Sequence, residues 1–101
     1  MTISSTPARQ DLDLAAIRLD LEIAETTRSR QLANLPAAAK DDMVAVLHRD
    51  SVERLLGEIR AALDRVDNGS YGFCARCHEP VPPARLELRP WAATCTTCGQ
   101  R

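Results

Sequence analysis

The chain has 101 residues and a mass of 11.1 kDa, which gives room for one domain, or for one small domain with an extension. Its formal net charge of −1 argues against a general polyanion binder, and the absence of a long apolar run or a secretory signal predicts a cytoplasmic protein with no membrane contact. All three aromatic residues follow residue 70, so the preceding part must pack through Leu, Ile, Val and Ala, which favours helices over a sheet.

Residues 1–10 are expected to form an N-terminal tail, and residues 11–69 a helical hairpin. The first helix is predicted over about residues 11–33, with Thr6-Pro7 as a candidate start because Thr can cap a helix and Pro suits its first position. Its apolar positions advance by three and four residues, as on one face of a helix. This stripe comprises Leu14, Ile17, Leu21 and Ala24, widened by Leu12, Leu19 and Ile23.

The turn of the hairpin is expected at residues 34–41. Pro36 disfavours helical geometry at Leu35, which marks the end of the first helix. Alternatively, the segment 36–39 opens the second helix and shortens the turn. Two long helices joined by a short turn fold back antiparallel, which predicts a coiled-coil hairpin roughly 35 Å long with its turn far from the C-terminal part.

The second helix is predicted over about residues 42–67. Asp41 or Asp42 can cap its N-terminus, and Asn68-Gly69 ends it. Two helices bury little surface by themselves, so the hairpin should lean on the C-terminal part or dimerise, and a plain dimerisation stalk is the simpler alternative. The apolar stripe of this second helix is better defined and comprises Val52, Leu55, Leu56, Ile59, Leu63 and Val66.

Residues 70–101 are expected to form a small zinc finger with four cysteine ligands. Each Cys-x-x-Cys pair places two thiolates on one tight turn, and two such turns facing each other supply the tetrahedral sulfur shell that Zn²⁺ prefers. Four thiolates fill the coordination sphere, so one structural Zn²⁺ per chain is expected. The pattern C-x2-C-x17-C-x2-C is formed by Cys74, Cys77, Cys95 and Cys98.

Other uses of these cysteines stay open at this point. Two disulfides would need an oxidising compartment, and a thioredoxin-like redox use would need a βαβ pattern that is missing. Ligand type alone permits an iron–sulfur cluster. His78 follows Cys77 and could replace a thiolate, although a solvated loop residue is the simpler interpretation. No nucleophile–base pair, phosphate loop or paired-carboxylate site is recognisable, so no enzyme is expected.

Prolines between the two cysteine pairs are expected to keep the chain out of helix, with a short turn or strand over residues 84–89. Few large apolar groups lie in this part, so the metal should supply most of its folding free energy, on the order of 10 kcal/mol. The basic residues around the centre are Arg76, Arg85 and Arg89. Compensation of the negative charge of a zinc ion bound by four thiolates explains them better than nucleic-acid contact, and sequence-specific DNA binding is not expected.

The stretch Arg65–Cys74, which reads RVDNGSYGFC, leads into the remaining cysteines through Pro80, Arg85-Leu86 and Pro90. It resembles the DksA/TraR family of bacterial zinc-finger proteins. In that family a helix ends in a D-x-G-x-Y-G-x-C run, and an R-L…P element separates the two knuckles. The resemblance covers about residues 47–98, whereas residues 1–46 match through the hairpin pattern alone.

The resemblance implies a non-enzymatic regulator of transcription initiation that binds RNA polymerase rather than a DNA sequence. Members of the family insert the coiled-coil hairpin into the secondary channel of the polymerase, so that the tip approaches the active site, often together with the alarmone ppGpp. The alternative function is a zinc-stabilised adaptor or dimerisation module for another protein or the ribosome. Whether the chain forms a homodimer is left open.

Two departures from the family concern the tip and the first knuckle. The tip motif Asp-x-x-Asp-x-Ala is absent from residues 34–42, and helix capping explains the two adjacent aspartates there. Glycine is common in the family at the position of His78, so His78 would carry strain if the knuckle requires a positive φ. The candidate partner-binding residues at the tip are Asn34, Lys40, Asp41 and Asp42.

Overall fold

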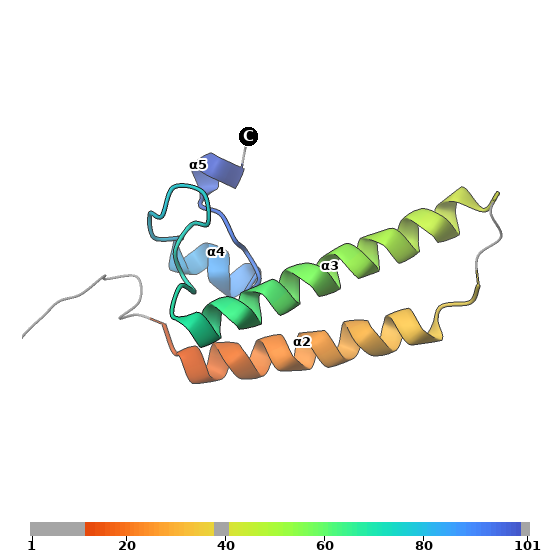
Figure 1. Cartoon of the computed structure of the whole chain (residues 1–101), viewed down its shortest axis with the longest axis horizontal. Coiled ribbons are helices and arrows are strands. Elements are labelled where there is room, and N and C mark those ends of the chain that lie inside the picture. Colours follow the sequence, from red (N-terminus) through yellow and green to blue (C-terminus); the bar gives the residue numbers. More distant parts are fainter. Residues whose placement is uncertain (1–11, 38–40, 100–101) are drawn as a thin grey trace, which may run out of the picture.

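Two long helices form an antiparallel hairpin in the computed structural model, which describes residues 12–37 and 41–99 (Figure 1). Helix α2 spans Leu14–Asn34 and helix α3 spans Met43–Asn68, and the two pack against each other. The molecule is elongated, with principal extents of 60 × 29 × 21 Å. The predicted fold class, a mostly helical hairpin followed by a small four-cysteine module, is confirmed. Within the described ranges, no helix is long and apolar enough to cross a membrane.

Helix α2 begins with a side-chain cap. The carboxylate of Asp13 accepts a hydrogen bond from the Ala16 N–H at 3.1 Å, which satisfies one of the free amides at the helix start. The candidate start at Thr6-Pro7 and the expected tail over residues 1–10 lie outside the described residues.

Helix α3 also begins with an aspartate cap. The carboxylate of Asp42 accepts a hydrogen bond from the Ala45 N–H at 3.1 Å, so Asp42 and not Asp41 is the N-cap. The helix starts at Met43, so the alternative in which Pro36 opens the second helix is wrong.

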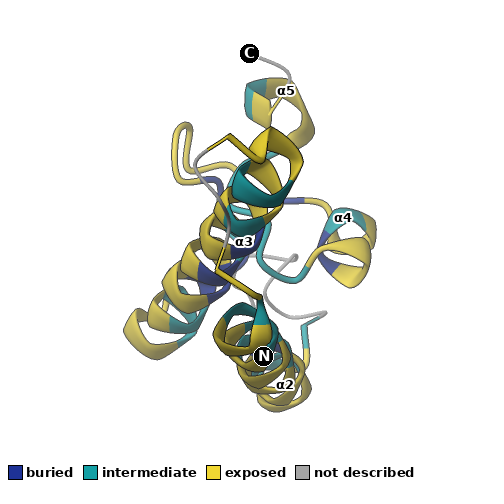
Figure 2. Ribbon diagram, turned by 90° about the vertical axis from the view of Figure 1, so that its right-hand side faces the viewer, coloured by how far each residue is buried: buried dark blue, intermediate teal, exposed yellow. Residues whose placement is uncertain are grey.

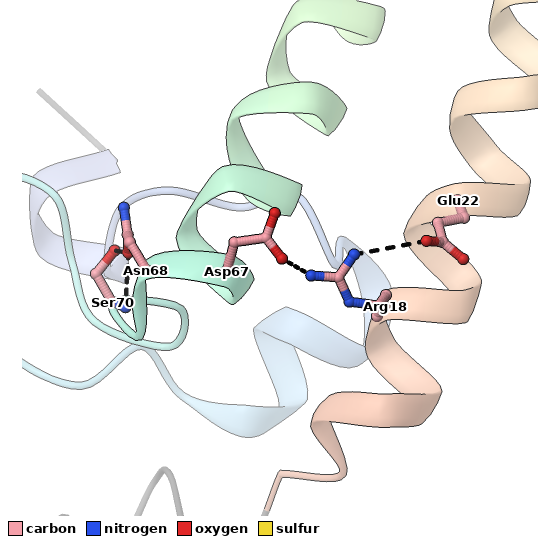
Figure 3. Close-up of polar contacts among 5 residues, drawn as sticks. All are labelled: Arg18, Glu22, Asp67, Asn68 and Ser70. Atoms are coloured by element: carbon pink, nitrogen blue, oxygen red, sulfur yellow. Dashed lines mark hydrogen bonds and ion pairs between the residues drawn. The ribbon is translucent and has the colours of Figure 1, made fainter.

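A left-handed glycine ends α3, as the sequence predicts. Gly69 has a φ of 86°, a conformation that glycine adopts without steric cost. The carbonyl of Arg65 accepts hydrogen bonds from the amides of Ser70 and Tyr71 at 3.0 and 3.1 Å. The Asn68 side chain accepts bonds from the amide and the hydroxyl of Ser70, which fixes the first residue beyond the cap (Figure 3).

The core lies where the base of the hairpin meets the C-terminal part (Figure 2). Leu21 of α2, Ile59 of α3 and Tyr71 beyond α3 are fully buried and belong to the same cluster. Val81 and Leu86, from the segment between the two cysteine pairs, also belong to it. The expectation that the hairpin leans on the zinc module is therefore confirmed, because both share one core.

The buried stripe of α2 is narrower than predicted. Leu19 and Ile23 are 55% and 56% exposed, so the prediction that they widen the buried stripe is wrong. In a two-helix hairpin each helix has one long neighbour, so only side chains that face that neighbour lose contact with water. The positions of α2 and the residues just before it that do contact the core are Leu12, Leu14, Ile17, Leu21 and Ala24.

The segment between the cysteine pairs contains a helix, not the expected turn or strand. Helix α4 spans Pro83–Leu88 and begins with Pro83. Proline is tolerated at the first helical position because its missing N–H would have no partner there. Among the described residues, extended pairing is limited to one isolated bridge between Phe73 and Pro80.

Candidate metal centre

The four cysteines of the pattern converge on one point. Helix α5 (Thr96–Gly99), which contains Cys98, lies at the end of the molecule opposite the hairpin turn (Figure 1). All four Sγ atoms lie within 4.8 Å of one another, and those of Cys77 and Cys95 are 3.7 Å apart. Zinc–sulfur bonds of about 2.3 Å in a tetrahedron place neighbouring sulfurs about 3.8 Å apart. The donor set therefore fits a single structural Zn²⁺ held by Cys74, Cys77, Cys95 and Cys98.

The disulfide alternative does not fit this geometry. All four thiols are free, and a separation of 3.7 Å between Sγ atoms far exceeds a disulfide bond of about 2.05 Å. His78 is exposed and lies outside the metal-binding group found in the described part of the chain. The simpler interpretation of His78, a solvated loop residue, agrees with this position.

The first knuckle requires an unusual backbone conformation at His78. Its φ is 67°, and its N–H donates to the Cys74 carbonyl at 2.9 Å, which closes the turn. The strain expected from a positive φ at this position is thus present. Helix α5, Thr96–Gly99, closes the second knuckle in a similar way through a bond from the Gly99 N–H to the Cys95 carbonyl at 2.8 Å.

The pKa values of Cys74 and Cys98 are shifted in opposite directions. Burial raises the pKa of Cys74, but backbone amides, among them those of Cys77 and Arg76 at 3.5 and 3.4 Å from its Sγ, lower that pKa to about 5. Hydrogen bonding to the Cys95 side chain and burial raise the pKa of Cys98 to about 12. Zinc requires all four thiolates, so metal binding must displace protons from this cluster.

The finger is held together by hydrogen bonds to main-chain carbonyls that sequence reasoning missed. The Tyr71 hydroxyl donates to the Pro90 carbonyl at 2.6 Å, and Arg85, expected only to compensate charge, donates from Nε to the Thr94 carbonyl at 2.9 Å. Main-chain carbonyls are identical at every residue, so no sequence pattern could have indicated these bonds.

An exposed ion-pair group lies beside the base of the hairpin. The guanidinium of Arg18 on α2 pairs with Asp67 on α3 and, at 3.5 Å, with Glu22 one turn along α2 (Figure 3). The side chains of Arg18 and Asp67 are 38% and 60% exposed, so this pair adds little stability.

The candidate tip residues lie at the far end of the hairpin from the cysteines. Asn34 is the last residue of α2, Asp41 is an exposed turn residue, and Asp42 caps α3. Lys40 lies outside the described residues. The structure thus brings Asn34, Asp41 and Asp42 to one end, with the carboxylate of Asp42 already used by its own helix.

The tip has two further features without a sequence signal. Arg49 of α3 reaches across the hairpin, and its Nη2 donates to the carbonyls of Leu35 and Pro36 at 3.4 and 3.5 Å. Apolar side chains at the start of α3 are also exposed. These side chains are Met43, Val44 and Leu47.

Comparison with known proteins bears on the finger first. The family model described as the prokaryotic dksA/traR C4-type zinc finger matches residues 69–101 of this chain. The RNA polymerase-binding transcription factor DksA of Caulobacter vibrioides is 36% identical over 77 residues, which are 76% of this chain and 54% of that protein. The chain belongs to the DksA/TraR family.

Other DksA proteins agree with this assignment. DksA of Haemophilus influenzae is 30% identical over 74 residues, which are 73% of this chain and 51% of that protein. The chain thus spans about half the length of the curated DksA relatives it matches. A solved structure of the RNA polymerase binding protein and transcriptional regulator Dks from Chlamydia trachomatis covers 89% of this chain and 86% of its own, with a TM-score of 0.66 and 22% identity. This likeness shows the fold.

Proposed function

We propose that this chain is a non-enzymatic regulator of transcription initiation that binds RNA polymerase. The observation that carries the proposal is a hairpin of α2 and α3 joined to a C4 finger whose relatives are named RNA polymerase-binding transcription factors. Four thiolates leave a zinc ion no open coordination position for water or substrate. This agrees with a centre that supports binding rather than catalysis.

The hairpin would enter the secondary channel of the polymerase with its tip first. Helix α3 has 26 residues, so at about 1.5 Å per residue it extends about 39 Å. The finger packs on the base of the hairpin, which leaves the distal part only two helices wide (Figure 1). A narrow projection with a bulky base suits insertion into a channel, with the finger held at the rim.

The tip side chains Asn34, Lys40, Asp41 and Asp42 would then contact the polymerase. Asp42 also serves α3, so replacing it with Ala would fray the helix and confuse two effects. Asparagine caps a helix about as well as aspartate does, so Asp→Asn removes the charge and keeps the cap.

Binding of the zinc-loaded full chain to purified core RNA polymerase tests the proposal. We expect saturable binding by the unchanged protein, and about 10-fold weaker binding or loss of the effect on transcription when Asp41→Asn and Asp42→Asn are combined. The matched control combines Asp20→Asn and Asp64→Asn, which removes two exposed carboxylates far from the tip and should retain binding. No binding at about 50 µM would overturn the proposal.

One observation favours the adaptor or dimerisation alternative. Leu19 and Ile23 form an exposed apolar pair one turn apart on the outer face of α2. Sedimentation equilibrium separates the alternatives, because the polymerase-binding proposal expects a species of 11.1 kDa in solution. A stable dimer that is dissociated by Ile23→Glu and does not bind polymerase would support the alternative.

A further inference from the structure

Residues 90–94, here called the strap, lead directly into Cys95 without helix or strand structure. Each successive carbonyl oxygen of the strap accepts a hydrogen bond from a group outside it. The donors come from the end of α3, the loop after it, the first knuckle and α4. The bonds run from Tyr71 Oη to Pro90 (2.6 Å), from Arg65 Nη2 to Trp91 (3.3 Å) and Ala92 (3.5 Å), from the Ala75 amide to Ala93 (2.7 Å) and from Arg85 Nε to Thr94 (2.9 Å).

Arg85 contacts both ends of the second knuckle. Its Nε donates to Thr94, the residue before Cys95. A Cβ placed on Gly99, the residue after Cys98, would lie 2.7 Å from Nη2 of Arg85, so the guanidinium lies directly against that glycine. One side chain on α4 therefore contacts the chain just before Cys95 and just after Cys98.

Arg65 connects the same strap to the hairpin. It lies in the last turn of α3, and its own carbonyl accepts the amides of Ser70 and Tyr71 that end the helix. Its guanidinium is partly buried between the helix and the carbonyls of Trp91 and Ala92. A buried guanidinium without acceptors would be costly, which favours retention of these contacts.

We propose that Arg65 and Arg85 are positioning residues of the zinc site, which hold the strap so that Cys95 and Cys98 stay in place and zinc is released slowly. They act through main-chain carbonyls and do not touch the ion. Groups outside the ligand shell commonly change metal affinity by 10- to 100-fold, because they fix the orientation of the ligands. The inference concerns zinc retention and holds whether or not the chain binds polymerase.

Zinc release from the loaded full chain to an excess of the chromophoric chelator 4-(2-pyridylazo)resorcinol measures this role. Arg65→Met and Arg85→Met keep the aliphatic part of the side chain and remove the donors, and each should release zinc about 10-fold faster. Arg65→Lys and Arg85→Lys keep one charged donor and should recover part of the loss. Arg60→Met is the matched control on α3, because Arg60 pairs with Glu25 at 3.0 Å and does not contact the strap, so its release rate should be unchanged.

Thermal unfolding with and without zinc separates positioning from general stabilisation. If the arginines act on the zinc site, the Met variants lower the unfolding midpoint of the loaded protein and leave that of the demetallated protein unchanged. Release at the unchanged rate in both Met variants, or equal acceleration in Arg60→Met, overturns the proposal. If a Met variant loads zinc poorly, the corresponding Lys variant is judged on the same two criteria.

Discussion

The hydroxyl of Tyr71 donates a hydrogen bond of 2.6 Å to the carbonyl oxygen of Pro90, and the whole Tyr71 side chain is buried. Tyr71 follows the end of α3, whereas Pro90 opens the strap that leads to the second cysteine pair. The bond therefore fixes the strap to the residue that follows the end of the hairpin, inside the core that hairpin and finger share. Burial, opposed in part by the charge of Arg65, raises the pKa of Tyr71 from 10.0 to about 12.

This raised pKa predicts a loss of stability at high pH. The folded state favours the neutral phenol, so its contribution to the free energy of unfolding is complete below about pH 10. As the pH rises from about 10 to 12, the free energy of unfolding should fall by about 2 to 3 kcal/mol. Urea unfolding of the zinc-loaded protein between pH 8 and about 12 measures this change. Tyr71→Phe should be about 1 kcal/mol less stable at neutral pH because it lacks the hydrogen bond, and its stability should fall less across the alkaline range. The same alkaline loss in both proteins would contradict the assignment to Tyr71.

Removing the side chain of Ile59 should destabilise the whole fold. Ile59 is fully buried in the core shared by the hairpin and the finger, so Ile59→Ala leaves a cavity that costs about 2 to 5 kcal/mol. Ile23→Ala makes the same chemical change at a side chain that is 56% exposed and should cost less than about 1 kcal/mol. Chemical denaturation followed by circular dichroism gives both values. Equal costs would mean that the packing face of the hairpin is misplaced.

The contrast between the two helices shows which parts of the packing a sequence pattern predicts. The stripe predicted for α3 is correct, and Val52, Leu56 and Ile59 are buried, because α3 faces α2 along one side and the finger at its base. In α2 the same pattern also includes Leu19 and Ile23, which face solvent. Periodicity shows that a helix has an apolar face, but the width of the buried part depends on how many neighbours the helix has.

The metal centre is predictable for a different reason. The spacing of the cysteines is local, so two short turns with fixed geometry follow without the rest of the fold. The groups that hold these turns are not predictable, because Arg65 and Arg85 reach carbonyls 26 and 9 residues away, and a carbonyl has no residue signature. Helix α4 escapes prediction because a run of prolines usually excludes helix, whereas Pro83 begins one.

His78→Gly should stabilise the protein. His78 has a φ of 67°, which a residue with a Cβ adopts at a cost and glycine adopts freely. Relief of this strain should outweigh the cost of the extra conformational entropy that glycine gives the unfolded chain. The free energy of unfolding should therefore rise by about 0.5 to 1 kcal/mol. Glu79→Gly is the control, since Glu79 is also exposed and has no positive φ, and it should be destabilising or neutral. The melting temperatures of the zinc-loaded variants measure both effects, and a destabilised His78→Gly variant would contradict the expectation.

Zinc removal should weaken the hairpin as well as the finger. Elemental analysis should find one Zn²⁺ per chain, and chelation should lower the melting temperature of the helical signal, because Tyr71, Val81 and Leu86 pack against Leu21 and Ile59. Cys74→Ser should have the same effect, since it removes a ligand that is almost fully buried. Helical melting that is independent of zinc would mean that the hairpin and the finger fold separately.

The absence of any buried side chain over residues 43–51 has a consequence for how the distal end behaves. The core holds α3 only from Val52 onward, so the free energy needed to open the hairpin should fall progressively toward its turn. Amide hydrogens in the first two turns of α3 should therefore exchange with solvent much faster than those around Ile59. A partner that binds the tip can thus change its conformation at little cost in free energy. The free energy of binding such a partner will then be the gain from the contacts that form, reduced by the conformational entropy lost when the tip becomes ordered.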